Sequence, residues 1–287
     1  MMAAERIEKL RVEMRREGID CYVVPSADFH QSEYVGDYFH AREYLTGFTG
    51  SAGTAVITAE EAVLFTDGRY FIQAEKELKG TSIQLMKMGE PGVPTLKEYV
   101  RKILPDQGVL GFDGRVISME DGCEYEKMVT AKGGAIRYES DLIDRIWTNR
   151  PSLSKEPAFE LDVCYAGESV EEKLARVRKE MEKVGADWHV LTTLDDIGWL
   201  LNLRGNDIAF FPMVLAYALI SMREVRLYID LDKLGEDLKA RLARAGVRFF
   251  AYEEIYREIG QLTDATLLLD RARMNYALYR EIPNSVA

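Results

Sequence analysis

The feature that most constrains the fold of this chain is an internal duplication. Residues 7–24 have the pattern of an amphipathic helix, a glycine stop and a β-rich strand, and residues 174–191 repeat it at a constant offset of 167 residues. The apolar stripe of the helix consists of Ile7, Leu10 and Met14 in the first copy and of Leu174, Val177 and Met181 in the second. The sequence therefore predicts two tandem copies of one module.

A second match between the copies locates an insertion. Residues 44–50 correspond to residues 199–205 at an offset of 155, so the first copy carries 12 additional residues (167 minus 155) before this match. The insertion falls near Asp28 to His40, a polar and aromatic segment with two of the three histidines of the chain. The copies are thus expected to share a fold but not every loop.

Each copy is expected to combine a strand hairpin with alternating helices and strands. Apolar runs at 54–58 and 62–66 predict the first hairpin, and those at 213–220 and 225–229 predict the second. Further helices are expected at 69–78, 95–103, 232–245 and 253–260 and from a cap at Ser118 to just before Gly133, and further strands at 83–86, 109–112, 135–138, 247–250 and 266–269. This order predicts the α/β class, with a mixed sheet flanked by helices in each copy.

The boundary between the copies has the composition of a linker. Residues 149–157 hold two prolines and two serines. We therefore expect one domain over residues 1–149 and a second, homologous domain over residues 158–287.

Charge and hydropathy restrict the classes of partner. The chain has 287 residues, a net charge of −11 and no basic patch, which argues against nucleic acid and anionic membrane surfaces. Its longest apolar run, 208–220, contains Pro212 and is shorter than the ~20 residues of a membrane-spanning helix. Cys21, Cys123 and Cys164 form no CxxC pair, and the first residues have no secretory signal pattern, so a cytoplasmic location is expected.

Neither copy shows a metal site or a nucleophile of its own. His30, His40 and His189 lack the spacing of metal ligands, and a hydrogen-bonding role is favoured over a metal role, with a pairing of His30 and His40 through space left open. The loop Gly50-Ser51-Ala52-Gly53 lacks the spacing of a GxSxG nucleophile elbow, of a phosphate loop and of a dinucleotide fingerprint. Its glycines indicate a tight turn or a close approach of the backbone.

The sequence Thr66-Asp67-Gly68-Arg69-Tyr70-Phe71 is the sharpest local feature. Thr66 or Asp67 can cap a helix whose first turn contains Arg69, where a cation opposes the helix dipole. That placement suggests a role other than helix stability, although local sequence alone favours a surface arginine paired with a neighbouring carboxylate. For Arg204 the same two interpretations apply, a functional role or a surface ion pair, and the functional role has less support.

Five segments in order along the chain carry a resemblance to a known family. They are Pro25 to Tyr34, Gly47-Phe48-Thr49-Gly50-Ser51-Ala52-Gly53-Thr54-Ala55, Thr66-Asp67-Gly68-Arg69-Tyr70-Phe71, Ile146-Trp147-Thr148-Asn149-Arg150-Pro151 and Asn202-Leu203-Arg204-Gly205-Asn206-Asp207. Taken together, they resemble the N-terminal half of the long, three-domain Xaa-Pro aminopeptidases of the creatinase and prolidase superfamily, and the match covers nearly the whole chain. The resemblance implies two tandem creatinase N-terminal-type domains with a ribonuclease H-like fold.

The resemblance also implies a metallopeptidase that removes an N-terminal residue preceding proline. In that family two metal ions, usually manganese, activate a water, and their two Asp, one His and two Glu ligands lie in a third, C-terminal domain. Nothing here corresponds to that domain, so no ligand is carried over and this chain alone is expected to be inactive. The peptide-binding arginine of the family's Thr-Asp-Gly-Arg motif matches Arg69. One departure, Phe210-Phe211-Pro212 in place of Asn before proline, argues against a polar role for that loop.

The leading hypothesis is that the chain is the non-catalytic portion of an Xaa-Pro aminopeptidase that serves substrate access, positioning and assembly. Its expected partners are its own C-terminal catalytic domain, a peptide with proline at the second position and a second copy in a full-length homodimer. The alternatives are a stand-alone binding protein derived from this family and the N-terminal part of a creatinase-like hydrolase. The reading frame beyond Ala287 discriminates between a fragment and a naturally short protein.

Overall fold

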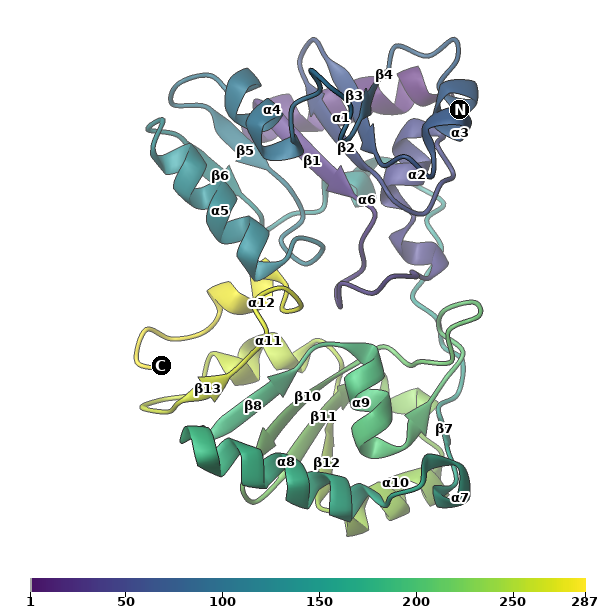
Figure 1. Cartoon of the computed structure of the whole chain (residues 1–287), viewed down its shortest axis with the longest axis vertical. Helices are drawn as coiled ribbons and strands as arrows, with labels where there is room; N and C mark the ends of the chain where they lie inside the picture. Colours follow the sequence, from purple (N-terminus) through teal and green to yellow (C-terminus); the bar gives the residue numbers. More distant parts are fainter. Residues whose placement is uncertain (1) are drawn as a thin grey trace. The chain divides into compact units, whose positions relative to one another are not determined.

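The chain folds into two compact units, each built around its own sheet. The computed structural model describes residues 2–287 (Figure 1). The first unit comprises the chain up to Asp28 together with Asp37–Ser152, and the second comprises Phe29–Gly36 and Leu153–Ala287. Phe29–Gly36, called the strap from here on, thus belongs to the second unit although the sequence places it in the first copy.

The sheet of the first unit is mixed. Its strands are β1 (Cys21–Pro25), β2 (Thr54–Thr58), β3 (Ala62–Thr66), β4 (Gln84–Lys87), β5 (Val109–Gly111) and β6 (Ala135–Arg137). They lie in the order β4-β3-β2-β1-β5-β6. β2 runs antiparallel to β1 and β3, whereas the other neighbours pair in parallel. All strands of this sheet other than β2 therefore have their carboxyl ends at one edge.

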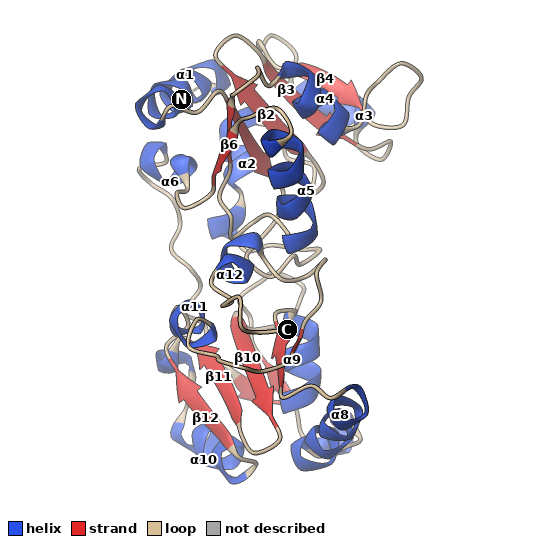
Figure 2. Cartoon of the chain, turned by 90° about the vertical axis from the view of Figure 1, so that its left-hand side faces the viewer, coloured by secondary structure: helices blue, strands red, loops and turns tan. Residues whose placement is uncertain are grey.

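Helices cover both faces of this sheet, as Figure 2 shows for α1 and α5. The helices of the first unit are α1 (Ala3–Glu17), α2 (Ala41–Thr46), α3 (Phe71–Glu77), α4 (Leu96–Ile103), α5 (Met119–Thr130) and α6 (Leu142–Ile146), with a 3₁₀ turn at Asp37–Phe39. α1, α2, α3 and α6 contribute to one apolar core with β1, β2 and β3. On the opposite face, the ring centroid of Tyr99 from α4 lies 5.4 Å from that of Phe65.

The sheet of the second unit repeats this topology. Its strands are β8 (Trp188–Leu191), β10 (Ala216–Ser221), β11 (Val225–Ile229), β12 (Val247–Phe250) and β13 (Leu267–Leu268), and a separate antiparallel pair is formed by β7 (Phe159–Glu160) and β9 (Leu203–Arg204). The order β12-β11-β10-β8-β13 matches β4-β3-β2-β1-β5, and β10 is the antiparallel strand, as β2 is in the first sheet. The duplication predicted from the sequence is therefore present in the topology.

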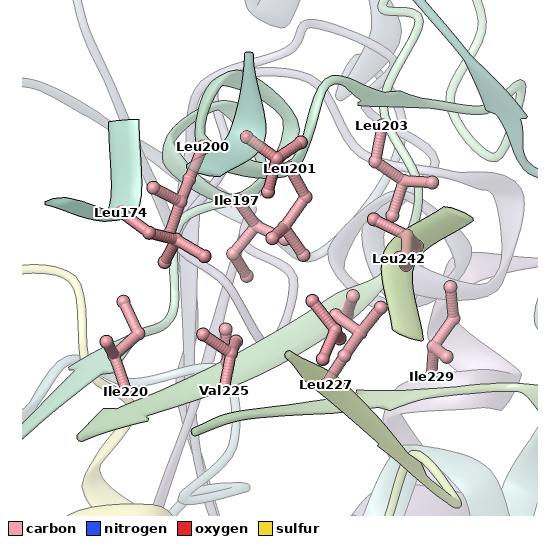
Figure 3. Close-up of a cluster of buried hydrophobic side chains, with 14 of the residues drawn as sticks. Leu174, Ile197, Leu200, Leu201, Leu203, Ile220, Val225, Leu227, Ile229 and Leu242 are labelled. Atoms are coloured by element: carbon pink, nitrogen blue, oxygen red, sulfur yellow. The ribbon is translucent and has the colours of Figure 1, made fainter. Parts of the chain in front are cut away.

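The helices of the second unit form its core with the sheet. They are α7 (Val163–Ala166), α8 (Val170–Val184), α9 (Leu194–Leu201), α10 (Glu236–Arg244), α11 (Glu254–Ile259) and α12 (Tyr276–Arg280), with a 3₁₀ turn at Leu231–Lys233. α8, α9 and α10 pack on one face of β10 and β11. Figure 3 shows side chains of α8 and α9, among them Leu174 and Ile197, facing Ile220 and Val225.

Helices α8 and α1 end in the same way but begin differently, because α1 has Met2 at its N-cap position and no side-chain capping bond there. Ser169 and Glu172 form the expected capping box at the start of α8. α8 ends at Gly185 with a φ of 68°, as α1 ends at Gly18 with a φ of 65°. Both glycines adopt the left-handed conformation, which is strained for any residue with a Cβ atom.

Strand registers reveal a second insertion, this time in the second copy. Cys21 pairs with Thr58, and its counterpart Trp188 pairs with Ser221, so the later strands are offset by 163 residues (221 minus 58). The offset rises from 155 to 163, which places eight additional residues between Gly205 and β10. We call residues 206–213 the inserted loop.

Two buried features hold the strap in the second unit. Nδ1 of His30 lies 2.7 Å from the carbonyl oxygen of Thr192, which can only accept, so this nitrogen carries the proton. Nε2 lies 2.6 Å from the hydroxyl oxygen of Tyr252, within hydrogen-bond distance. The amide nitrogen of Asn275 donates to the carbonyl oxygen of Phe29 at 2.9 Å. The strap is thus fixed by partners far along the chain.

Two elements of the second unit begin three and four residues later than the sequence predicts. The strand expected at 213–220 begins at Ala216, because the inserted loop occupies the residues before it. The helix expected at 232–245 begins at Glu236, because Asp230 accepts the N–H of Asp232 at 3.1 Å and caps a 3₁₀ turn first. Across residues 2–287, every helix is too short or too polar to span a lipid bilayer.

Candidate functional site

Arg69 lies in the turn that leaves β3 at the carboxyl edge of the first sheet. The expectation that it enters the first turn of a helix is wrong, because α3 begins at Phe71. Asp67 accepts the backbone N–H of Arg69 at 3.0 Å and closes a turn before the helix can start. The N-cap position of α3 is Tyr70, whose side chain makes no capping hydrogen bond, so neither Thr66 nor Asp67 serves as the cap.

Asp67 also binds the guanidinium of Arg69 with both carboxylate oxygens. Nε donates to Oδ1 at 2.9 Å and Nη2 donates to Oδ2 at 2.8 Å, a two-point pairing that fixes the plane of the group. The hydrogen bond from Arg69 holds the pKa of Asp67 below its usual value. The Arg69 side chain nevertheless keeps 65% of its surface exposed. The carboxylate pairing favoured by local sequence is therefore present, in a geometry that still exposes the cation.

Arg42 of α2 organises the glycine-rich loop 47–53 beside this turn. Its side chain is buried, and its two terminal nitrogens donate to the carbonyl oxygens of Phe48 and Gly50. Nε donates to the Ser26 hydroxyl at 2.9 Å. Burial lowers the pKa of the Arg42 guanidinium to about 10. Arg42 thus satisfies two backbone carbonyl groups of the loop with hydrogen bonds from its side chain.

The close approach expected of the loop glycines is found at Gly50. A Cβ atom on this residue would lie 2.3 Å from Cζ of Phe48 and 2.7 Å from Cδ1 of Tyr70, so only glycine fits. The hydroxyls of Ser51 and Tyr70 share a hydrogen bond of 2.7 Å. The loop is therefore packed against the residue that follows Arg69.

Glu77 of α3 holds the other side of the same loop. Its carboxylate accepts from the backbone N–H and from the hydroxyl of Thr49, both at 2.8 Å, and from the amide of Gln73 at 3.0 Å. Burial alone would raise its pKa, but these hydrogen bonds outweigh that effect and lower it. Hydrogen bonds therefore join loop 47–53 to α3, the helix that follows the Arg69 turn.

The second candidate, Arg204, has a different environment. It lies in β9 of the second unit, and its Nη1 donates to the carbonyl oxygens of Gly198 at 2.7 Å and Leu203 at 2.9 Å. Both acceptors belong to the end of α9 and the strand that follows. Arg204 thus stabilises a helix end, while Arg69 is displayed from a turn.

The three histidines have separate hydrogen-bonding environments. His30 is buried in the strap, His40 lies 3.2 Å from a carboxylate oxygen of Glu43, and His189 contacts the carbonyl oxygen of Leu268 at 3.0 Å. Among residues 2–287, no three His, Cys, Asp or Glu side chains come together in a group that could hold a metal ion.

Arg42 belongs to none of the motifs that the sequence suggests as functional. A signal existed in the duplication, because the 155-residue offset aligns Arg42 with Ile197, a fully buried residue of α9. A charged residue at a position that is apolar in the other copy indicates a local need for hydrogen-bond donors. Comparison of the copies position by position would have found it.

Comparison with known proteins assigns both units. Residues 6–136 match one model, and residues 149–287 match another, and each is described as a creatinase/prolidase N-terminal domain. The chain belongs to the creatinase/prolidase N-terminal domain family. Its two units are therefore tandem members of that family, as the resemblance implied.

Curated relatives extend the match to almost the whole chain. A probable Xaa-Pro aminopeptidase P of Laccaria bicolor is 41% identical over 269 residues, which cover 93% of this chain and 41% of the relative. Aminopeptidase P2 of Arabidopsis thaliana is 38% identical over 268 residues, with 91% of this chain and 37% of the relative covered. The chain is thus homologous to the N-terminal domains of Xaa-Pro aminopeptidases.

A solved structure shows the same arrangement of elements. The X-prolyl aminopeptidase of Caenorhabditis elegans, described as a cytosolic enzyme with a di-nuclear active site, superposes with a TM-score of 0.95 at 33% identity. The match covers 100% of this chain and 50% of that one. The chain therefore spans less than half the length of these two curated relatives and half of the solved enzyme.

Proposed function

We propose that this chain is the non-catalytic N-terminal region of an Xaa-Pro aminopeptidase and serves substrate access, positioning and assembly. The relatives of known name support this assignment, since they are Xaa-Pro aminopeptidases matched over at least 90% of this chain. In this proposal the substrate is a peptide with proline at its second position. The partners are the catalytic domain of the same protein and a second copy in a cytoplasmic homodimer.

The metal chemistry belongs to another part of the protein in this proposal. Residues 2–287 offer no fitting group of donors, so no step is assigned to a metal on this chain. Two divalent ions, manganese in our proposal, would be held by the catalytic domain. There they would supply an activated water.

The proposed role in substrate positioning rests on one observation, the exposed guanidinium of Arg69 that Asp67 holds in a fixed orientation. A guanidinium has five N–H donors in a fixed plane, and Asp67 engages two of them on one edge. Because Asp67 binds this plane at two points and the Tyr70 ring centroid lies 5.3 Å from Cζ of Arg69, little side-chain freedom is lost when a peptide binds. An exposed and oriented guanidinium suits a peptide carbonyl or carboxylate.

The test is Arg69→Ala in the complete enzyme, assayed with an Xaa-Pro peptide. A lost hydrogen bond to a charged group costs about 1.5–3 kcal/mol, so kcat/KM is expected to fall by roughly 10- to 150-fold. The matched control is Arg16→Ala, since Arg16 is also an exposed arginine paired with a carboxylate, Glu13. Equal kinetics for both variants would remove Arg69 from substrate positioning.

The non-catalytic assignment has a separate test. The purified chain should show no cleavage of an Xaa-Pro peptide with added manganese. Cleavage that a chelator abolishes would contradict the proposal. The naturally short binding protein remains the alternative that a stop codon directly after Ala287 would support.

A further inference from the structure

Phe210 of the inserted loop is the most exposed large apolar side chain among residues 2–287. Its relative exposure is 108%, so the ring makes almost no contact within the chain. The backbone at Phe210 has a φ of 62°, a left-handed conformation that is unfavourable for a residue with a bulky side chain. Strained conformations are commonly retained at binding sites, and a large aromatic side chain is a typical anchor of protein interfaces. Both properties therefore point to a binding role for this loop.

The backbone that presents Phe210 is held in place. Phe211 donates its N–H to the carbonyl oxygen of Ile208 at 3.2 Å, which closes a β-turn with Phe210 as its third residue. At the base of the loop, Asp207 pairs with Lys233 through atoms 2.5 Å apart, and both side chains are buried. Because the backbone is fixed before binding, little of its conformational freedom is lost when Phe210 contacts a partner.

A cavity of about 370 Å³ lies beside the base of the inserted loop. Two of its lining residues contact Asp207: Leu215 donates its N–H at 2.7 Å, and Lys233 forms the buried ion pair. The surface of the cavity is mainly apolar, and Ile229 and Ala251 contribute to it from the carboxyl ends of β11 and β12. Pockets of this size accept a whole small molecule, so a single aromatic ring fits.

We propose that the second unit binds a second copy of itself through this face, with Phe210 of each copy inserted into the cavity of the other. The occupant follows from the chain itself, which displays an exposed aromatic ring and, beside the base of the same loop, an apolar cavity that this ring does not occupy in its own chain. A surface that carries both sides of a contact is self-complementary, so one two-fold axis forms two equal contacts. Each inserted ring removes about 150–250 Å² of its surface from water.

The expected dimer is weak. Two ring contacts bury less than the ~1,200 Å² that stable interfaces reach, so dimer formation should depend on chain concentration in the micromolar to millimolar range. This interface specifies the assembly role proposed above, but it concerns the chain by itself and does not require peptidase activity.

The test is sedimentation equilibrium of the purified chain over this concentration range. An equilibrium between monomer and dimer is expected for the unmodified chain. Phe210→Gly should raise the Kd by about tenfold or more, because the ring is lost while glycine retains the positive φ of the turn. The matched control is Tyr165→Ala, since Tyr165 of α7 is also an aromatic residue of the second unit with an exposure of 80%. This control should leave the Kd unchanged.

A mixture of two variants tests the reciprocal geometry. Ala251→Phe, a change at an exposed residue of the lining, should block the cavity and weaken self-association as Phe210→Gly does. When the two variants are mixed, each mixed pair retains one intact contact. Native mass spectrometry should therefore find mixed dimers in excess of the proportion that random pairing gives.

Three results would each overturn the proposal. They are a purified chain that stays monomeric throughout the range, an unchanged Kd in Phe210→Gly, and random pairing in the mixture. Circular dichroism establishes that each variant is folded. None of these results bears on the peptidase assignment, which the cleavage assays described above test separately.

Discussion

Removal of the Lys233 ammonium is expected to destabilise the second unit strongly. Nζ of Lys233 and Oδ2 of Asp207 are 2.5 Å apart, and both side chains are buried. Oδ2 also accepts the backbone N–H of Leu215 at 2.7 Å. Lys233→Met keeps the apolar stem but leaves a carboxylate buried without its cation, which costs about 3–5 kcal/mol. The pair therefore ties the inserted loop to the 3₁₀ turn and to the start of β10.

A double-mutant cycle of Lys233→Met and Asp207→Asn isolates the free energy of the interaction between the two side chains. Asp207→Asn retains an oxygen for the N–H of Leu215 and is expected to cost about 3 kcal/mol, because it leaves the Lys233 cation unpaired. In the double variant no buried charge remains, so its cost should be smaller than the sum by about 2–3 kcal/mol. That coupling free energy is the quantity to measure.

Urea unfolding monitored by tryptophan fluorescence measures this coupling free energy for the second unit alone. Trp188 and Trp199 lie in that unit, and Trp147→Phe removes the tryptophan of the first. The control pair is Lys183 with Glu180, which is also a lysine and a carboxylate, 2.6 Å apart on the surface of α8. It should show no measurable coupling. A coupling near zero for the buried pair as well would refute the reasoning.

Three further predictions concern other features. Arg69→Ala should raise the pKa of Asp67 toward its ordinary value in an NMR titration, because the side-chain hydrogen bond is lost while the backbone N–H of residue 69 still donates. Since the pKa of Asp67 is lowered in the folded chain, its stabilising contribution is present above the unfolded pKa and is lost as the pH falls through the folded pKa. Gly50→Ala should lower the free energy of unfolding by about 1–3 kcal/mol through overpacking. Gly68→Ala, whose Cβ atom would meet its nearest neighbour at 3.9 Å, should change the thermal midpoint little. His30→Ala should destabilise the second unit by about 2–4 kcal/mol in urea, since it removes two buried hydrogen bonds, and an unchanged midpoint would contradict the anchoring role.

The topology could be predicted because both copies repeat local signals. Helical stripes, glycine stops and apolar strands recur at fixed offsets, and each depends only on neighbouring residues. The start of α3 at Phe71 could not be predicted from the sequence. Asp67 accepts the backbone N–H of Arg69, and this hydrogen bond stabilises a turn at the residues where the helix was expected to begin. Several residue types can cap or close this segment, and the sequence does not rank them.

The contacts of the strap and the pairing of Asp207 with Lys233 could not be predicted from the sequence, for a different reason. His30 finds its partners 162 and 222 residues further on, and no periodicity connects positions at such separations. The pairing of Asp207 with Lys233 likewise depends on the inserted loop, whose length became visible only through the strand registers. Arg69, by contrast, was accessible from sequence because its motif is continuous and local.

The position of the strap has a consequence for synthesis on the ribosome. Phe29 leaves the ribosome long before Asn275, which is 246 residues later and donates to its carbonyl group. At about 5–20 residues per second, that interval is about 12 to 50 s. During this time the first module can complete its sheet, while the strap still lacks the hydrogen bonds to Thr192, Tyr252 and Asn275 and is more accessible to chaperones and proteases. Slow translation should therefore increase proteolytic cleavage within residues 29–36 of the nascent chain.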